Sequence, residues 1–258
     1  MSGSWDAGIK DMLQYIIELV CVSAVWAPLL YLEWYGTATV QGFFCADTSL
    51  QYPYLESTMT ASIMYPVSCI FPILGVIISI YCGWKTNSLS LKSVYREVLV
   101  FAFGFGVAHL LVDVGKFYGG RLRPHFFDVC SPDWSQIDCS VGYITNYTCL
   151  GTNKTRLRKM RLSFPSAHGS CICYGAVFFL VYIQSRNLKK HLGVMPATLL
   201  QAAAVCLAFY TCITRITDNK HHVTDVIAGA CGGSAIGYWM AALLQKLPEP
   251  LSHMKKKS

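Results

Sequence analysis

Hydrophobic positions along the chain gather in six runs that are separated by polar stretches. Each run approaches the roughly 20 apolar residues that a membrane-spanning helix needs. The runs are Met12–Leu32, Ala61–Trp84, Val94–Val114, Gly169–Ser185, Val194–Ile213 and Val223–Leu244. The pattern therefore predicts an all-α polytopic membrane protein with six transmembrane helices. Because no internal repeat or low-complexity linker divides the chain, we expect residues 1–258 to form a single domain.

The composition supports a bilayer rather than water as the main solvent. Only 14% of the residues are charged, whereas soluble domains carry about a quarter, and the mean hydropathy is +0.40. The net charge of +7 does not indicate a nucleic-acid partner, because the basic residues lie between hydrophobic segments instead of covering one face.

Two polar connections are long enough to build structure outside the membrane. Residues 33–60 contain no Lys or Arg and read as a loop, and residues 117–164 form the longest polar segment, with glycosylation sequons at Asn146 and Asn153. Eight of the twelve cysteines lie in apolar runs, where they pack as small hydrophobic residues. The other four would form disulfides if their loops face an oxidising compartment, in a pairing that the sequence leaves open: Cys45, Cys130, Cys139 and Cys149.

The distribution of positive charge favours one orientation. With six spans, the side that holds both termini carries eleven Lys and Arg and the opposite side ten. The positive-inside rule weighs short loops, and most of the ten lie in the long third loop or beside candidate phosphate ligands. We therefore expect both termini in the cytosol, with residues 12–32 as a retained anchor rather than a cleaved signal peptide.

The most specific chemical pattern is RITDNKHHVTD, from Arg215 to Asp225. On a helix, His221 and Asp225 would share one face, so the carboxylate could fix the imidazole tautomer and leave the other ring nitrogen free to attack. Arg215 would then bind an anionic oxygen through its planar fork. A purely structural histidine–carboxylate contact is the alternative reading.

Two earlier motifs carry little weight alone. Lys116 and Arg123 flank two glycines in KFYGGRLRP, and paired cations at a membrane boundary often only contact lipid head groups. PSAH, from Pro165 to His168, reads as a helix start whose serine is an N-cap and whose free amides could cradle phosphate. Under the predicted topology all three motifs meet at the non-cytosolic face, which favours a phosphoryl-transfer site there.

KFYGGRLRP, SFPSAH and TRITDNKHHVTD resemble, in order, the three signature motifs of the type 2 phosphatidic acid phosphatase superfamily. The flanks GRLRPHF and DNKHHVTDV are similar to its animal lipid phosphate phosphatases, also called phospholipid phosphatases. The resemblance covers nearly the whole chain. It implies a phosphatase that needs no metal or other cofactor and acts on a lipid phosphate monoester drawn from the bilayer: phosphatidate, lysophosphatidate, sphingosine 1-phosphate or ceramide 1-phosphate.

The resemblance also implies a role for each motif residue. His221 is similar to a nucleophile that forms a phosphohistidine, Asp225 to its orienting partner, and His168 to the general acid and base. The implied phosphate ligands are Lys116, Arg123, Ser166, Ala167 and Arg215. Two positions depart from the family pattern: Ala167 replaces a usual glycine, and Thr214 replaces a common serine. We expect the amides to survive if Ala167 is already helical.

Other readings remain open from the sequence. A polyprenyl-pyrophosphate phosphatase would share the motifs, and a catalytically silent lipid-binding relative is expected to lack a reacting residue, although none is lost here. A transporter could use Glu18, His109 and Asp113 inside the spans but would leave the motifs unexplained. A hydrogen-bonded contact between helices is the favoured reading for His109 and Asp113. A homo-oligomer is compatible with the sequence, which does not define the oligomeric state.

The resemblance favours the plasma membrane as the location. The C-terminal Lys255, Lys256, Lys257 and Ser258 have the pattern of a dilysine retrieval signal, which would instead hold the protein in the endoplasmic reticulum.

Overall fold

The computed structural model describes residues 2–85, 91–186 and 188–246. Its α-helices are α1 (Ser2–Tyr35), α2 (Ala61–Lys85), α3 (Leu91–Gly119), α4 (Phe126–Cys130), α5 (Lys154–Lys159), α6 (Ala167–Ser185), α7 (Lys189–Leu192), α8 (Val194–Thr217) and α9 (Val223–Lys246). Short 3-10 turns η1 (Thr48–Leu50), η2 (Trp134–Gln136) and η3 (Cys139–Val141) and two strands, β1 (Phe43–Phe44) and β2 (Tyr143–Ile144), complete these elements. The C-terminal lysines lie outside the described residues.

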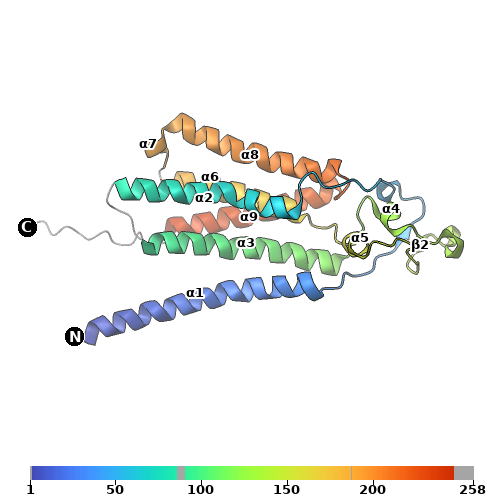
Figure 1. Cartoon of the computed structure of the whole chain (residues 1–258), viewed down its shortest axis with the longest axis horizontal. Coiled ribbons are helices and arrows are strands. Elements are labelled where there is room, and N and C mark those ends of the chain that lie inside the picture. The colour runs from blue at the N-terminus through green and yellow to red at the C-terminus, as the bar shows by residue number, and fades with distance from the viewer. Residues whose placement is uncertain (1, 86–90, 187, 247–258) are drawn as a thin grey trace, which may run out of the picture.

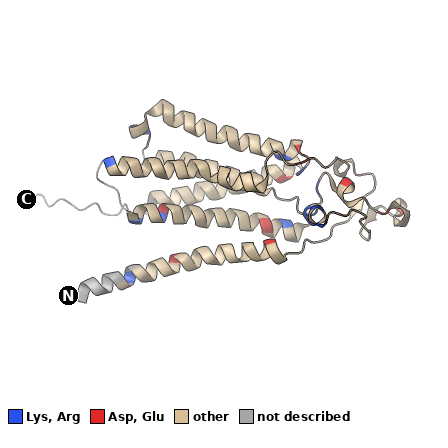
Figure 2. Ribbon diagram, viewed as in Figure 1, with Lys and Arg blue, Asp and Glu red and all other residues tan. Residues whose placement is uncertain are grey.

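Six helices in the described part of the chain are long and apolar enough to cross a membrane: α1, α2, α3, α6, α8 and α9. They lie roughly side by side (Figure 1), which confirms the predicted all-α polytopic architecture. Charged residues are mostly confined to the helix ends and loops (Figure 2). The helices extend beyond the predicted apolar runs, so that Lys116 lies in the last turn of α3 and Arg215 in the last turn of α8. Both cations are therefore held by regular backbone.

Helices α6 and α9 pack so closely that their backbones touch. Gly229, Gly233 and Gly237 recur every four residues on one face of α9, and their neighbours on α6 are backbone atoms of Ser166, Ser170 and Tyr174. A Cβ atom built on these glycines would lie 2.3, 2.0 and 2.7 Å from the three carbonyl oxygens. Small residues at a spacing of four allow this approach between helices in membranes. The contact holds the start of α6 beside the start of α9.

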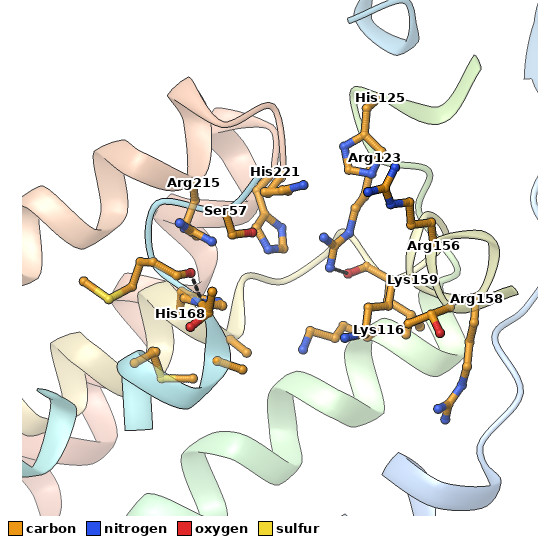
Figure 3. A pocket seen from close by; sticks show the side chains of 18 of the residues that line it. Ser57, Lys116, Arg123, His125, Arg156, Arg158, Lys159, His168, Arg215 and His221 are labelled. Carbon is orange, nitrogen blue, oxygen red and sulfur yellow. Dashed lines mark hydrogen bonds between the residues drawn. The ribbon is translucent and has the colours of Figure 1, made fainter. Parts of the chain in front are cut away.

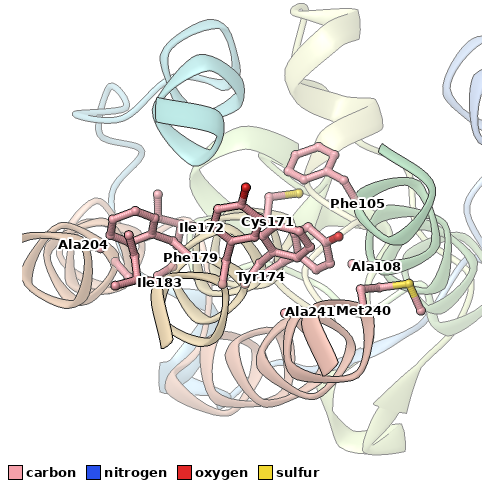
Figure 4. Packing of buried hydrophobic residues seen from close by; sticks show 14 of the residues in the cluster. Phe105, Ala108, Cys171, Ile172, Tyr174, Phe179, Ile183, Ala204, Met240 and Ala241 are labelled. Atoms are coloured by element: carbon pink, nitrogen blue, oxygen red, sulfur yellow. The ribbon is translucent and has the colours of Figure 1, made fainter. Parts of the chain in front are cut away.

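Helix α6 forms the centre of the bundle. Its buried aromatic residues Tyr174 and Phe179 pack among apolar side chains from α2, α3, α8 and α9 (Figure 4). Between α2 and α6, Gly175 lies against the Ser68 carbonyl, where a Cβ would be 2.1 Å away. Because α6 contacts helices on all sides, the position of its first turn is fixed by the core rather than by a flexible loop.

The first and third loops combine into a lobe at one end of the bundle, so the reading of residues 33–60 as only a loop was incomplete. Strand β1 pairs antiparallel with β2, and buried Phe43 and Phe126 pack against each other in the lobe's apolar core. Two disulfides join Cys45 to Cys139 and Cys130 to Cys149. They confirm that the four cysteines of the polar connections are paired and resolve which pairs form.

Polar residues inside the spans have local partners. The Tyr65 hydroxyl on α2 lies 2.9 Å from Nε2 of His109 on α3, which confirms the expected interhelical contact. Gln14 Nε2 donates to Glu18 Oε1 at 2.8 Å along α1. Near the start of α3, buried Glu97 accepts a 2.7 Å hydrogen bond from the Tyr182 hydroxyl and pairs with Arg186.

Candidate active site

A cavity of about 500 Å³ opens where the lobe meets the helix ends. Six of the eight predicted catalytic and phosphate-binding residues line it: Lys116, Arg123, Ala167, His168, Arg215 and His221. Figure 3 shows Arg215, His221 and His168 on one wall, and Lys116 and Arg123 on the facing wall. Three motifs that are far apart in the sequence therefore meet around one space. The other two residues, Ser166 and Asp225, are fully buried behind it.

Ser166 acts as the helix N-cap. Its hydroxyl oxygen accepts a hydrogen bond from the Gly169 amide at 3.3 Å, as the local reading of PSAH predicted. Ala167 is the first helical residue of α6, so its Cβ causes no backbone strain. The condition under which we expected Ala167 to keep the amide cradle is met.

The ring of His221 is oriented by a backbone carbonyl. Nδ1 lies 2.7 Å from the Ser163 oxygen, and because a carbonyl can only accept, Nδ1 carries the proton. Nε2 is then left with its lone pair. Burial is the main cause that lowers the pKa of His221 to about 3; the Asp225 carboxylate opposes this effect, and the charges of Arg123 and Lys116 add to it. The imidazole is therefore neutral near pH 7, as a nitrogen nucleophile must be.

The prediction that His221 and Asp225 lie on one helix is wrong. His221 precedes α9, which begins at Val223, so the helical spacing does not apply and the Asp225 oxygen stays 3.8 Å from Nδ1. The Asp225 carboxylate instead accepts hydrogen bonds from Arg121, from the Ser163 hydroxyl at 2.6 Å and from the His222 amide at 2.9 Å. Asp225 and the ring thus share Ser163 as a common neighbour.

The ring of His168 is also oriented by a backbone carbonyl. Its Nε2 lies 3.0 Å from the Met59 carbonyl oxygen in the first loop, so Nε2 donates and Nδ1 is the nitrogen that can exchange a proton with a ligand. Met59 lines the same cavity. The lobe therefore contributes directly to the orientation of a predicted catalytic side chain.

Each of the three predicted cations is held by a specific partner. Lys116 pairs with Asp113 at 3.1 Å and Arg215 with Asp218 at 2.8 Å. Arg123 donates to the Leu162 carbonyl at 3.2 Å. Burial, with Arg215 as a second cause, lowers the pKa of Arg123 to about 10, so the guanidinium stays charged at neutral pH. The cavity is strongly electropositive and suits a phosphate group.

Further cations in the cavity were not singled out from the sequence. Lys220 lies 3.4 Å from the centre of the Tyr54 ring and donates to the Leu55 carbonyl. Burial and the nearby Arg123 lower its pKa to about 8. Arg156 reaches in from α5 and lies 4.0 Å above the same Tyr54 ring. Neither residue could be identified from sequence patterns, because only the folded first loop brings Tyr54 between them.

His125 and Asp218, which follows the last residue of α8, were also missed. His125 Nδ1 donates to the Asn219 carbonyl at 2.7 Å, and burial lowers the pKa of His125 to about 4. Asp218 accepts two 2.8 Å hydrogen bonds from Thr58, which ties the first loop to the end of α8. His125 directly follows the first motif and Asp218 lies within the third, so position in or beside a motif was the only available signal.

Within the described ranges, no three His, Cys, Asp or Glu side chains are grouped so as to hold a metal ion. Asn146 and Asn153 are both exposed on the lobe, where a glycosyltransferase could reach them. The Asn153 side-chain oxygen also caps α5 by accepting from the Arg156 amide at 3.1 Å.

Comparison with known proteins decides the family. A model of the PAP2 superfamily matches residues 97–249, which include all three motifs. The chain belongs to the PAP2 superfamily. Phospholipid phosphatase 1 of Rattus norvegicus is 36% identical over 237 residues, covering 88% of this chain and 83% of that relative. Phospholipid phosphatase 2 of Bos taurus is 33% identical over 229 residues, with 86% and 79% covered. No solved structure matches the chain.

Proposed function

We propose that this integral membrane protein hydrolyses lipid phosphate monoesters through a phosphohistidine on His221, without a metal ion. The chain is an enzyme of the phosphoric monoester hydrolase type, since it belongs to the PAP2 superfamily and its relatives are named phospholipid phosphatases. The observation that carries the mechanism is the neutral His221 ring, with its lone pair on Nε2, at the wall of a cavity lined by cations.

In the first half-reaction Nε2 of His221 attacks phosphorus, and a P–N bond forms as the bond to the lipid oxygen breaks. Lys116, Arg123 and Arg215 neutralise the charge on the phosphoryl oxygens, a task that Mg²⁺ performs in other phosphoryl-transfer enzymes. His168 enters this step doubly protonated, with Nε2–H on the Met59 carbonyl, and gives the proton on Nδ1 to the departing lipid alkoxide. The lipid alcohol leaves and the phosphoryl group stays on the histidine.

The second half-reaction reverses these roles. His168, now neutral, removes a proton from water, whose oxygen attacks phosphorus as the P–N bond breaks. Inorganic phosphate is released and His221 regains its neutral form. Asp225 contributes through Ser163, which holds both the carboxylate and the His221 ring. The proposed substrates are phosphatidate, lysophosphatidate, sphingosine 1-phosphate and ceramide 1-phosphate.

We further propose that the cavity faces the outside of the cell or the lumen of an organelle. Both disulfides lie in the lobe at the cavity end, and disulfides persist in oxidising compartments. Helix α1 begins at the opposite end of the bundle (Figure 1), so this orientation places the N-terminus in the cytosol. The plasma membrane remains the proposed location, with the endoplasmic reticulum as the alternative.

The test is phosphate release from phosphatidate in detergent micelles with EDTA present. We expect the wild type to be active and His221→Ala to be inactive, whereas His222→Ala retains most of the activity because its ring contacts the Leu122 carbonyl behind the cavity. Undiminished release by His221→Ala would refute the mechanism. Absence of release by the wild type from every lipid phosphate monoester would refute the proposed substrate class.

A further inference from the structure

The cavity continues from the phosphate-binding cations into the membrane-spanning part of the bundle. Asp113, His109 and Tyr65 line it together with Lys116, which reaches the cavity from α3 (Figure 3). Asp113 and His109 precede Lys116 by three and seven residues on α3, so they lie roughly 4.5 and 10 Å deeper along the helix axis. A lipid whose phosphate contacts Lys116 would pass these residues as its chain enters the bilayer.

One carboxylate oxygen of Asp113 lacks a hydrogen-bond donor among the residues that the structure describes. Only 2% of the residue is exposed, and Oδ1 pairs with Lys116 at 3.1 Å. The second oxygen, Oδ2, lies 3.5 Å from His109 Nδ1 and accepts no hydrogen bond from any described residue. A buried carboxylate oxygen without a hydrogen bond is costly. Ionisable side chains inside a span are rare and usually serve function.

His109 and Tyr65 complete the wall around this oxygen. The Tyr65 hydroxyl contacts His109 Nε2 at 2.9 Å, so the ring of His109 is fixed from the far side and its Nδ1 remains turned toward Asp113. Tyr65 is 40% exposed and lines the cavity beside buried Met64. The polar wall therefore borders the space that the lipid would enter.

We propose that Asp113, positioned with His109 and Tyr65, binds a hydrogen-bond donor on the lipid carbon next to the phosphate ester. The donor would be a hydroxyl or an ammonium group, and lipids that carry one would be favoured over lipids that carry an ester there. This specificity rests on the proposed phosphatase function. The rise of about one helical turn between Lys116 and Asp113 is comparable with the few bonds that separate a phosphate from a substituent on the neighbouring carbon.

The alternative is that Asp113 serves only to position Lys116. The two roles differ in what a substitution changes. If Asp113 acts through Lys116 alone, Asp113→Asn lowers the rate on every lipid phosphate by the same factor. If Asp113 binds a donor, the loss is greater for donor-bearing lipids, and the ratio of their kcat/KM values changes.

The experiment measures kcat/KM on matched pairs of lipids in detergent micelles. One pair is lysophosphatidate and its analogue without the hydroxyl next to the phosphate ester carbon. The second pair is sphingosine 1-phosphate and its analogue without the amino group. We expect the wild type to prefer the donor-bearing member of at least one pair, and Asp113→Asn to reduce that preference roughly tenfold, because hydrogen bonds to charged groups are among the stronger ones.

Tyr65→Phe is the second variant, since it keeps the shape of the side chain. We expect a smaller reduction, roughly fivefold, because Tyr65 acts through His109 and loses a neutral hydrogen bond. Tyr182→Phe is its matched control. It also removes a tyrosine hydroxyl that contacts a buried polar side chain, in this case the Glu97 carboxylate. Glu97 lies 19 positions before Lys116 on α3 and so roughly 28 Å away along the helix axis. We expect no change in either ratio for Tyr182→Phe.

The outcomes separate the possibilities. Loss of preference in the hydroxyl pair identifies the donor as a hydroxyl, and loss in the amino pair identifies it as ammonium. Unchanged ratios in Asp113→Asn, with equal losses on all four lipids, would overturn the proposal and leave Asp113 as a positioning residue for Lys116. A wild type that hydrolyses none of the four lipids would instead contradict the proposed phosphatase function.

Discussion

The contact between α6 and α9 yields a prediction that links packing to catalysis. Helix α6 carries His168 in its first turn, and His221 lies two residues before the start of α9. Gly233 lies where the two backbones meet: an added Cβ would be 2.0 Å from the Ser170 carbonyl oxygen and 2.7 Å from its carbon. Gly232, the next residue, faces outward, and a Cβ there meets nothing within 4 Å.

The expected magnitude for Gly233→Ala follows from these distances. Ordinary contact begins near 3.4 Å, so the helices must separate by about 1.4 Å at this level. Because backbone rather than a flexible side chain is in the way, the strain should cost about 1–3 kcal/mol of stability. A displacement of about 1 Å between reacting groups can lower the rate roughly 100-fold. We therefore expect kcat to fall by one to two orders of magnitude.

The assay compares Gly233→Ala with Gly232→Ala in the same detergent. Phosphate release gives kcat and KM, and thermal unfolding followed by tryptophan fluorescence reports stability. We expect Gly232→Ala to match the wild type in both measurements. Equal behaviour of the two variants would refute the reasoning that the α6–α9 distance sets the geometry of the two histidines.

Three further predictions concern groups around the cavity. Arg121→Met should lower kcat roughly 5- to 30-fold, equivalent to about 1–2 kcal/mol, because it removes a charged hydrogen bond from Asp225. The Arg121 side chain is 38% exposed, which weakens that bond and keeps the expected effect modest. An unchanged kcat would contradict a positioning role for Arg121. The pKa of Lys220 is about 8, so its side chain is mostly protonated below pH 8 and mostly neutral above it. The KM should therefore rise above pH 8 in the wild type but only at higher pH in Lys220→Arg. Coincident pH profiles of KM in the two proteins would exclude Lys220 from phosphate binding. Replacing Cys130 and Cys149 by serine should lower the free energy of unfolding by about 3 kcal/mol, seen as a lower Tm in the absence of reductant, while the Cys45–Cys139 disulfide stays intact; a Tm equal to that of the oxidised wild type would contradict this.

The six spans and the convergence of the three motifs could be predicted because both depend on local signals. Apolar runs of about 20 residues define spanning helices, and alternating topology then places Lys116, His168 and Arg215 at one end. The sequence could not predict that His221 lies just before α9 rather than within it. Helix boundaries depend on tertiary contacts, here the three hydrogen bonds that the Asp225 carboxylate accepts.

The contribution of the lobe was the other feature that local patterns could not show. The Met59 carbonyl that orients His168, and Tyr54 between Lys220 and Arg156, come from a first loop without secondary-structure periodicity. Its position is set by pairing with residues about 100 positions later, such as Phe43 with Ile144. The proposed role of Asp113 in lipid binding could not be inferred from the sequence for a related reason. It depends on Asp113 and Lys116 lining the same cavity, which only the folded chain shows.

The central claim is that His221 carries the phosphoryl group during turnover. The most direct measurement is rapid quenching of the protein into alkali during hydrolysis of a lipid phosphate, followed by mass spectrometry of the peptide that contains His221 and His222. We expect a phosphoryl group on His221 in the wild type, and we expect it to be lost on acidification because the P–N bond is acid-labile. We expect no phosphopeptide in His221→Ala. A phosphoryl group on His222 or His168, or hydrolysis by His221→Ala at the wild-type rate, would contradict it.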